Sequence, residues 1–384
     1  MLKILTIIGA RPQIIKAAAL SRAIKNQYSG RIQEVIVHTG QHYDANMSQV
    51  FFDELGIPVP DYNLNVGSGS HGKQTAAMIA GIEEILQTEK PGAIVLYGDT
   101  NSTLAGAVAA SKIHIPVVHI EAGLRSFNKS MPEELNRILC DHVSTLLFSP
   151  TQTGYRNLLR EGFPENNNGP YTADNPKIYH CGDVMYDNSL YFSAMAEQKT
   201  DIMKRLDLLK NNFVLATVHR NNNTDEPDRL NALFRALNEI SEHYALKVVL
   251  PLHPRTAKLL EQNLDPVLLR KIRDNKKFII TQPASFLEMT ELEKNCRLVM
   301  TDSGGVQKEA FYFKKPCIIL RPETEWLELV ECGSAMVTDA DEQRILHAFA
   351  HFESNKSLVF PEFYGNGRAA EFICTEMLKH LAQA

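Results

Sequence analysis

The sequence opens with LKILTIIGARPQ (residues 2–13), a short apolar run that ends in Gly-Ala-Arg-Pro. The run predicts a buried β-strand over Leu2–Ile8. Gly9 permits a tight turn, and Pro12, with a fixed φ and no N–H, suits the first turn of a helix. A strand that passes through a tight turn into a helix is the repeating unit of a parallel α/β sheet.

The same pattern recurs along the 384 residues. Short apolar runs alternate with longer amphipathic stretches, which predicts parallel sheets covered by helices on both faces. The first series of expected strands is Leu2–Ile8, Glu34–Val37, Ala93–Tyr97, Val117–Ile120 and Leu146–Phe148. The second series is Lys177–His180, Phe213–Thr217, Lys247–Leu250, Phe278–Thr281, Leu298–Thr301 and Cys317–Leu320.

A stretch rich in Asn, Pro and Gly, near residues 163–176, separates the two series and indicates a domain boundary. We therefore expect an α/β protein with two doubly wound, Rossmann-like domains, 1–170 and 171–366, and a central cleft. Periodicity does not say which domain the last helical stretch, Gly367–Leu381, covers. Because ligands of open α/β sheets bind beyond the carboxyl ends of the strands, the residues after each strand are the candidates for function.

Composition excludes several classes of protein. Forty basic and 45 acidic side chains give a net charge of -5, without an overall bias toward nucleic acid or anionic membranes. No apolar run approaches the roughly 20 residues that span a bilayer, and the first residues lack a signal-peptide cleavage site. The six cysteines are scattered, without a zinc-binding spacing. We expect a cytoplasmic protein with neither a disulfide framework nor a bound metal.

Charged side chains follow several strands of the first series. Arg11 lies at an expected helix N-terminus, where anions bind, and Lys16 lies about one turn later. Asp99 and Glu121 each follow a buried strand. A carboxylate in such a place is costly without partners, which makes Glu121 the stronger candidate. For Asp99 a turn or helix cap is the alternative interpretation, and for the two cations a solvated helix start.

The segment MPEELNR (residues 131–137) begins another expected helix at Pro132. Glu133 and Arg137 share a face of that helix, because they are four residues apart. One interpretation is a surface ion pair. The other is a second active-site carboxylate that faces Glu121, since two carboxylates in different environments separate acid from base at neutral pH.

In the second half, TDSGGVQKEA (residues 301–310) leads from a strand through Ser-Gly-Gly into a helix. The free N–H groups and the dipole at such a helix start would hold a phosphate. Glu309 is placed to accept hydrogen bonds from sugar hydroxyls, such as those of a ribose. His219 and Arg321 follow two other strands. A simple turn is the alternative, but Glu309 and Arg321 favour a diphosphate site.

These motifs resemble those of the non-hydrolysing UDP-N-acetylglucosamine 2-epimerases over nearly the whole chain. GARPQIIK (9–16) is similar to the family's GTRPExIK, and MPEELNR to its PEExNR. GDTNSTLAGAVAASKIHIPVVHIEAGLRS (98–126) is similar to the GDTxTT…IPVxHxEAGLR block. TVHRNNN (217–223) resembles T-HRxEN, and TDSGGVQKEA resembles TDSGGxQEEA.

The resemblance implies a fold of the glycosyltransferase-B type, with the last helix (367–384) packed back on the N-terminal domain. It also implies a homodimer, a UDP-sugar substrate and no cofactor. The implied reaction inverts C2 of a UDP-2-acetamido sugar through UDP elimination, a glycal intermediate and re-addition, and would supply bacterial surface polysaccharides. A hydrolysing relative, a glycosyltransferase of the same fold and a non-catalytic UDP-sugar sensor are the alternatives.

The resemblance further implies roles for single residues. Asp99, Glu121 and Glu133 match the family's catalytic carboxylates, and Arg137 matches a substrate-binding arginine of the active site. We also expect His219 to act in catalysis as well as in binding. The positions that match UDP contacts are Arg11, Lys16, His219, Ser303, Gly304, Gly305, Glu309 and Arg321.

Four parts of the sequence depart from the family pattern. The usual TERPE reads TEWLE over residues 324–328, and Lys308 stands where an acid is common. Gln41–Asp44 and Lys73 differ from the polar set that binds a second, activating UDP-N-acetylglucosamine in some members, which argues against allosteric activation. The TEW form and Gln41–Asp44 together are more similar to the subgroup acting on UDP-2,3-diacetamido-glucuronate.

Overall fold

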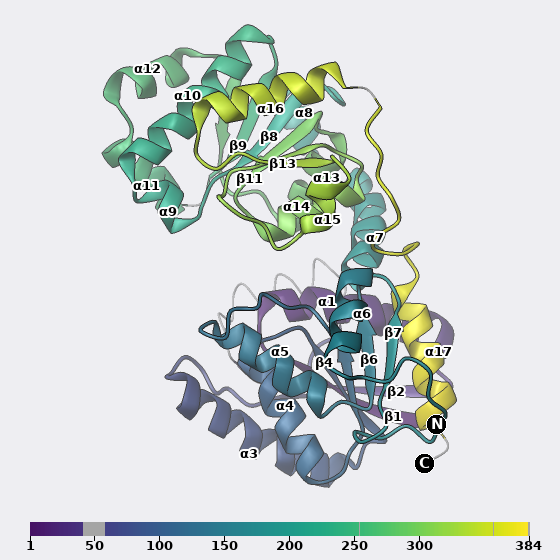
Figure 1. Ribbon diagram of the computed structural model, residues 1–384. Coiled ribbons are helices and arrows are strands. Elements are labelled where there is room, and N and C mark those ends of the chain that lie inside the picture. The colour runs from purple at the N-terminus through teal and green to yellow at the C-terminus, as the bar shows by residue number, and fades with distance from the viewer. Residues whose placement is uncertain (41–57, 253, 356, 383–384) are drawn as a thin grey trace. The chain divides into compact units, whose positions relative to one another are not determined.

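The computed structural model describes residues 1–40, 58–252, 254–355 and 357–382 (Figure 1). The chain divides into two compact units, each built around its own sheet. The first unit comprises Met1–Asn188 and Glu362–Ala384, and the second comprises Ser189–Pro361.

The sheet of the first unit has seven strands among the described residues, all paired in parallel. Their order is β3-β2-β1-β4-β5-β6-β7, so the direction of winding reverses between β1 and β4, as in a Rossmann fold. The strands are Leu2–Ile8 (β1), Ile32–His38 (β2), Tyr62–Asn63 (β3), Ala93–Tyr97 (β4), Val117–Ile120 (β5), Leu146–Ser149 (β6) and Lys177–His180 (β7).

The described part of the second unit repeats this topology with six parallel strands. Their order is β10-β9-β8-β11-β12-β13, with the reversal between β8 and β11. The strands are Phe213–Thr217 (β8), Lys247–Pro251 (β9), Phe278–Thr281 (β10), Leu298–Thr301 (β11), Cys317–Ile319 (β12) and Ala335–Val337 (β13). The expectation of two doubly wound α/β domains of the glycosyltransferase-B type is confirmed.

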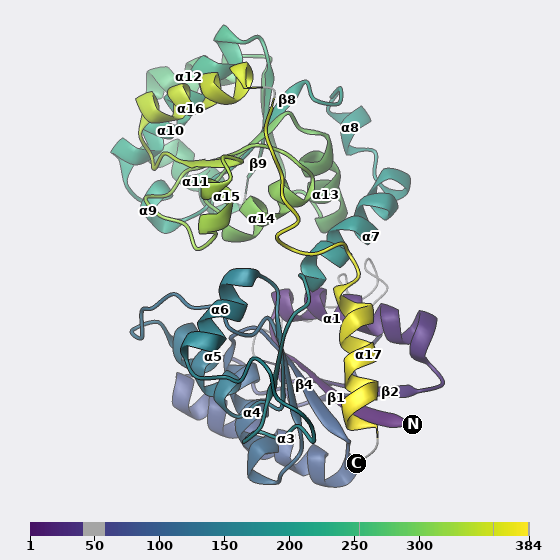
Figure 2. The ribbon, with the colours of Figure 1, turned by 45° about the vertical axis from the view of Figure 1, so that its right-hand side comes forward.

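Helices cover the sheet of the first unit (Figures 1 and 2). They are Arg11–Ala23 (α1), which continues as a π-helical turn over Ile24–Tyr28, His71–Glu89 (α3), Asn101–Lys112 (α4), Pro132–His142 (α5), Gln152–Arg160 (α6) and Ala369–Leu381 (α17). The central strand β4 is fully buried because apolar side chains of α3 and α4 pack over it. The C-terminal helix α17, yellow in Figure 2, belongs to this unit and packs beside α1.

The helices of the second unit are Ile202–Arg205 (α8), Asn221–Thr224 (α9), Pro227–His243 (α10), Pro254–Asn263 (α11), Pro266–Asp274 (α12), Phe286–Asn295 (α13), Gly304–Tyr312 (α14), Leu327–Glu331 (α15) and Glu342–Ser354 (α16). Helix α7 (Val184–Lys199) begins in the first unit and ends in the second. Apolar residues of α10 and α16 form the core with β8 and β9.

All the expected strands form, but one of them belongs to the other sheet than the one predicted. Lys177–His180 was placed in the second series, whereas β7 pairs with β6 and completes the first sheet. The Asn- and Pro-rich stretch before it is a loop within the first unit, and the chain passes to the second unit at Asn188. Composition marks that loop but does not say with which strand the next segment pairs. The central cleft stays a prediction.

Three further observations bear on the class of protein. No helix of the described segments is both long and apolar enough to cross a membrane. All six cysteines are free thiols. Among the described residues, no three His, Cys, Asp or Glu side chains gather as they would around a metal ion.

Candidate functional site

The first strand leads into α1 through a turn that Gln13 holds. The Gln13 side-chain oxygen accepts hydrogen bonds from the backbone N–H of Gly9 (2.9 Å) and of Ala10 (3.2 Å). Its amide nitrogen donates to the Tyr97 carbonyl and to Thr103, both at 3.0 Å. One buried side chain therefore joins the carboxyl ends of β1 and β4. Arg11 stands exposed at the start of α1.

Lys16 and Glu121 meet at this edge of the sheet. The Lys16 ammonium forms an ion pair with Glu121 Oε2, and the two side chains are only 14% and 13% exposed. The turn after β4 passes directly beside them, because a Cβ on Gly98 would lie 3.2 Å from both charged atoms. Asp99 is the next residue after Gly98, so the turn that carries Asp99 runs beside the Lys16–Glu121 ion pair.

Asp99 has its own cation. Arg137 donates to Asp99 Oδ2 over 2.6 Å, and its other terminal nitrogen donates to Glu134 Oε2 over 2.7 Å. Asn136 donates to the Asp99 carbonyl over 2.8 Å. Two residues of α5 thus hold the Asp99 turn.

The adjacent acids of α5 differ sharply. Glu133 is exposed. Glu134 is 1% exposed and accepts the N–H groups of Ser126 and Phe127, each over 2.9 Å. Burial would raise the pKa of Glu134, but these N–H donors and Arg137 lower it below its usual value. Glu134 therefore fixes the loop before α5 as an ionised acid.

In the second unit, Asp302 organises the segment after β8. Its fully buried carboxylate accepts the N–H of His219 (3.0 Å), the N–H of Arg220 (3.0 Å) and the Asn223 amide (3.1 Å). The His219 ring nitrogen Nδ1 lies 3.0 Å from it. Burial would raise the pKa of Asp302, but the His219 side chain and the N–H donors lower it. A constant negative charge thus orients the exposed imidazole of His219.

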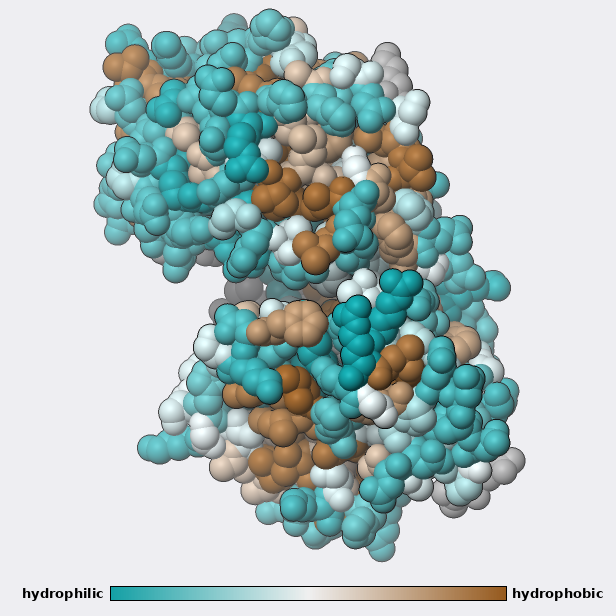
Figure 3. Space-filling view, in the orientation of Figure 1, coloured by the Kyte–Doolittle hydropathy of each residue, from teal (hydrophilic) through white to brown (hydrophobic). Residues whose placement is uncertain are grey.

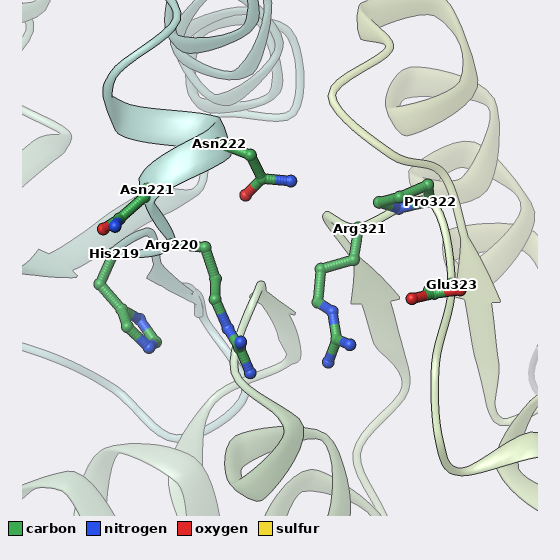
Figure 4. Close-up of a pocket in the computed structure, with 7 residues that line it drawn as sticks. All are labelled: His219, Arg220, Asn221, Asn222, Arg321, Pro322 and Glu323. Atoms are coloured by element: carbon green, nitrogen blue, oxygen red, sulfur yellow. The ribbon is translucent and has the colours of Figure 1, made fainter. Parts of the chain in front are cut away.

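Next to this carboxylate lies a hollow of about 610 Å³, lined by His219–Asn222 and Arg321–Glu323. Figure 4 shows the side chains of His219, Arg220 and Arg321 extending in the same direction. Arg321 also pairs with Glu325 over 2.9 Å. Two guanidinium groups and an imidazole that converge on one hollow suit an anion with several charges, such as a diphosphate.

The helix start at Ser303–Gly305 is held by the segment that follows Arg321. Trp326 donates its indole N–H to the Gly304 carbonyl over 2.9 Å, and the Lys308 ammonium lies 4.4 Å from the centre of the indole ring. The Glu325 carboxylate lies directly against Gly304. Lys308 and Trp326, which both depart from the family pattern, are therefore in contact.

Glu309 faces a second acid. It hydrogen-bonds to Glu293 of α13, which is 2% exposed. Burial and the Glu309 carboxyl raise the pKa of Glu293 well above its usual value. The protonated form of Glu293, which can donate to Glu309, is therefore the one that this environment favours.

A family model described as UDP-N-acetylglucosamine 2-epimerase matches residues 23–378. The chain belongs to the UDP-N-acetylglucosamine 2-epimerase family. It is 47% identical to the UDP-2,3-diacetamido-2,3-dideoxy-D-glucuronate 2-epimerase of Pseudomonas aeruginosa, over 98% of this chain and all of that one. It is 41% identical to the UDP-N-acetylglucosamine 2-epimerase of Methanocaldococcus jannaschii, over 97% of this chain and 98% of that one.

A solved structure of a member of this family, the M. jannaschii UDP-GlcNAc 2-epimerase, is a complex with UDP-GlcNAc and UDP. Its sequence is 40% identical to this chain. The superposition covers 98% of this chain and all of that one, with a TM-score of 0.80. The recognition of an epimerase from the sequence motifs is confirmed.

Within each unit, the expected residues of this epimerase family lie at the carboxyl edge of a sheet. Asp99, Glu121, Lys16 and Arg137 come together in the first unit, whereas Glu133 stands apart as an exposed acid. In the second unit, His219 and Arg321 line one hollow, and Ser303–Gly305 begin α14 with Glu309 in it. Gln41–Asp44 lie outside the described residues. The roles assigned to these residues stay predictions.

Four residues that hold or line these sites were not predicted from the sequence: Gln13, Arg220, Glu134 and Asp302. A signal existed for Gln13, because a Gln three residues after the N-cap position can accept hydrogen bonds from the backbone N–H groups at the helix start. Arg220 directly follows His219 in the quoted motif. Asp302 carried no such signal, because its partners lie in the segment after β8, a strand that neighbours β11 only in the folded sheet.

Proposed function

We propose that this chain is a non-hydrolysing UDP-sugar 2-epimerase whose substrate is UDP-2,3-diacetamido-2,3-dideoxy-glucuronate. The observation that carries the proposal is the pair of acids, Asp99 and Glu121, each matched with its own cation at one sheet edge. The identity to the P. aeruginosa enzyme and the TEW form of residues 324–326 support this choice of sugar over UDP-N-acetylglucosamine.

The chemistry is an elimination followed by an addition. The C2 hydrogen is weakly acidic until the C1–O bond to UDP stretches and positive charge builds on the ring. A carboxylate takes the proton, the C2–H electrons form the C1–C2 double bond, and UDP leaves with the C1–O electrons. The glycal then receives a proton on the other face of C2, and UDP adds back to C1. Carboxylates stabilise the positive charge in both directions.

Residues of the second unit would stabilise the leaving group, UDP. His219, Arg220 and Arg321 can neutralise the diphosphate as negative charge develops on it, together with the N-terminus of α14. Glu309, kept as an acceptor by Glu293, is placed for ribose hydroxyls. We retain His219 as a catalytic group, because Asp302 orients it and it lies where the leaving diphosphate would be.

The test is incubation of the wild type in deuterated water with each of the two UDP-sugars. The expected result is deuterium at C2 and interconversion of two intact UDP-sugars, faster with the diacetamido-glucuronate. The Asp99→Asn variant is the control that should exchange little. Faster exchange with UDP-N-acetylglucosamine would overturn the choice of sugar. Free sugar plus UDP would identify a hydrolase, a need for an acceptor would identify a glycosyltransferase, and binding without exchange would identify a sensor.

We also propose that the protein is a homodimer. Four large apolar side chains, 39 to 77% exposed, lie on and just before α5: Phe127, Met131, Leu135 and Leu139. Figure 3 shows apolar atoms gathered over this part of the first unit. Leu135 and Leu139 are one helical turn apart, so they present one face, which a second copy would bury. The free cysteines favour the cytoplasm as its compartment.

Light scattering tests the dimer. We expect the mass of a dimer for the wild type and of a monomer for Leu135→Glu. Val267→Glu, which changes an exposed valine on α12 of the second unit, is the matched control and should stay a dimer. A monomeric wild type would contradict this proposal.

A further inference from the structure

Behind the two acids of the first unit lies a buried charged network that the reaction itself does not use. Its centre is His119 in β5, whose side chain is fully buried. We propose that His119 is a positioning residue, a buried imidazolium held between Asp141 and the Gly98 carbonyl that fixes the two turns carrying Asp99 and Glu121. The inference deepens the proposed function and rests on it for the roles of those acids.

Both ring nitrogens of His119 have acceptors. Nδ1 lies 2.6 Å from Asp141 Oδ1, on α5, and Nε2 lies 2.8 Å from the carbonyl oxygen of Gly98. A carbonyl oxygen only accepts hydrogen bonds, so Nε2 carries a proton. Gly98 is the residue before Asp99, so this hydrogen bond fixes the backbone of the turn that carries Asp99.

Asp141 is ionised, which requires a proton on Nδ1 as well. Its second oxygen, Oδ2, accepts the Gly123 N–H over 3.1 Å and lies 2.7 Å from the Arg125 guanidinium. An acid that faces a guanidinium and a backbone N–H keeps its charge. Since Asp141 only accepts and Gly98 only accepts, the His119 ring donates on both sides and is positively charged.

The charged groups around the ring agree with this assignment. Cys140 and Asp141 of α5 face the ring, and Arg125 reaches it through Asp141 while also pairing with Glu161. Burial by itself opposes the charge, but Cys140 and the Asp141 carboxylate outweigh it and hold the pKa of His119 well above its usual value. Burial would raise the pKa of Asp141, but His119 and Arg125 lower it.

One of the two turns that this network holds, the turn at Glu121, is strained. Glu121 is a non-glycine residue with φ 75°, a conformation that costs about 1–3 kcal/mol unless the surroundings impose it. Its N–H and that of Ala122 both donate to the Phe148 carbonyl, over 3.0 and 3.1 Å. Gly98 and Gly123, which contact the two ends of the network, also have positive φ, 62° and 78°. The His119–Asp141 pair thus links the turn at Gly98 to the strained turn at Glu121.

The test uses Asp141→Asn, which keeps the shape of the side chain but removes its charge. We expect turnover to fall roughly 10- to 100-fold, since small displacements of reacting groups are costly. The affinity for UDP should change less than about threefold, because the hollow lined by His219, Arg220 and Arg321 is in the second unit. Asp61→Asn is the matched control: Asp61 also accepts a backbone N–H, that of Ile36 over 2.7 Å, elsewhere in the same unit, and turnover should be unchanged.

A pH profile separates positioning from a merely structural role. In the wild type His119 stays charged across the range of activity. In Asp141→Asn the ring loses the carboxylate that raises its pKa, so burial favours the neutral ring, which donates a hydrogen bond from only one nitrogen. The ratio of variant to wild-type turnover should therefore rise as the pH falls below neutral. A ratio that stays flat with pH, or turnover within twofold of the wild type, would overturn the inference.

A measurement without catalysis keeps the inference separate from the proposed function. Nitrogen-15 NMR of histidine-labelled protein should show a ring with two protonated nitrogens up to alkaline pH, assigned to His119 by its loss in His119→Gln. A neutral ring at pH 7 would refute the imidazolium. If instead the ring is charged but the wild type exchanges no C2 hydrogen, the proposed function is wrong, whereas the assignment of His119 as an imidazolium is kept.

Discussion

The Arg137 guanidinium bridges Asp99 and Glu134, over 2.6 and 2.7 Å. One cation thus joins an acid at a strand end to a buried acid at the start of α5. Because Glu134 also holds the loop at Ser126 and Phe127, a movement of Arg137 away from Asp99 would leave a buried carboxylate short of its cation. Asp99 therefore lies in a position that the fold fixes before any sugar binds.

The first prediction concerns the two acids that have cations of their own. Asp99→Asn or Glu121→Gln should lower turnover by roughly 10²- to 10⁴-fold, because each removes a group that transfers a proton or stabilises charge. UDP affinity, measured by calorimetry, should fall only modestly. Near-normal deuterium exchange in either variant would show that its assigned role is wrong.

The second prediction separates two neighbours on α5. Glu133→Gln should lower turnover and leave stability within about 0.5 kcal/mol, because the side chain is exposed. Glu134→Gln should instead cost about 1–3 kcal/mol of stability, since a buried carboxylate loses its charge-assisted bonds. Urea unfolding and exchange assays on both variants test this. Full turnover in Glu133→Gln would remove Glu133 from the catalytic residues.

The third prediction concerns the cationic hollow of the second unit. His219→Ala and Arg321→Ala should each weaken UDP binding by roughly tenfold or more, because a charge-assisted bond to a phosphate is lost. Arg220→Ala should do the same, and Arg270→Ala, at a basic residue of α12 that does not line the hollow, is the control. A defect in turnover alone, with unchanged UDP affinity, would contradict a binding role.

The fourth prediction uses the chain's one tryptophan. Because the Trp326 indole N–H donates to the Gly304 carbonyl, UDP binding at the start of α14 should change its fluorescence. Trp326→Phe should weaken UDP binding about fivefold, the equivalent of one neutral hydrogen bond. Lys308→Gln, which removes the cation over the ring but keeps the N–H bond, should have a smaller effect. Fluorescence that does not respond to saturating UDP would contradict this coupling.

The apolar runs predicted nearly every strand because a fully buried parallel strand is apolar on both faces. They missed β3 and β13, which are short, and they could not assign β7 to a sheet, because strand pairing across a loop is a tertiary property. The same limit applies to the site. Glu121 stood out as a charge after a buried strand, whereas the His119–Asp141 pair is formed by residues 22 positions apart that meet only when α5 packs on β5.

The last prediction concerns pH and the C-terminal helix. Asp187 accepts the N–H groups of Ala369 and Ala370 at the start of α17, over 3.2 and 2.8 Å. Burial nevertheless raises the pKa of Asp187 to about 6. The folded state therefore binds this proton more tightly than the opened state, so the stabilisation is present at low pH and is lost as the pH rises through about 6.

Hydrogen exchange at the amides of α17 measures this effect. Relative to Asp187→Asn, the free energy of opening α17 in the wild type should fall by up to about 3 kcal/mol between pH 4 and pH 7, at about 1.4 kcal/mol per pKa unit. The amides of α16, in the other unit, should show no such difference between the two proteins and serve as the internal control. A difference for α17 that grows with pH would mean that the two N–H donors outweigh burial and that Asp187 is ionised in the folded protein.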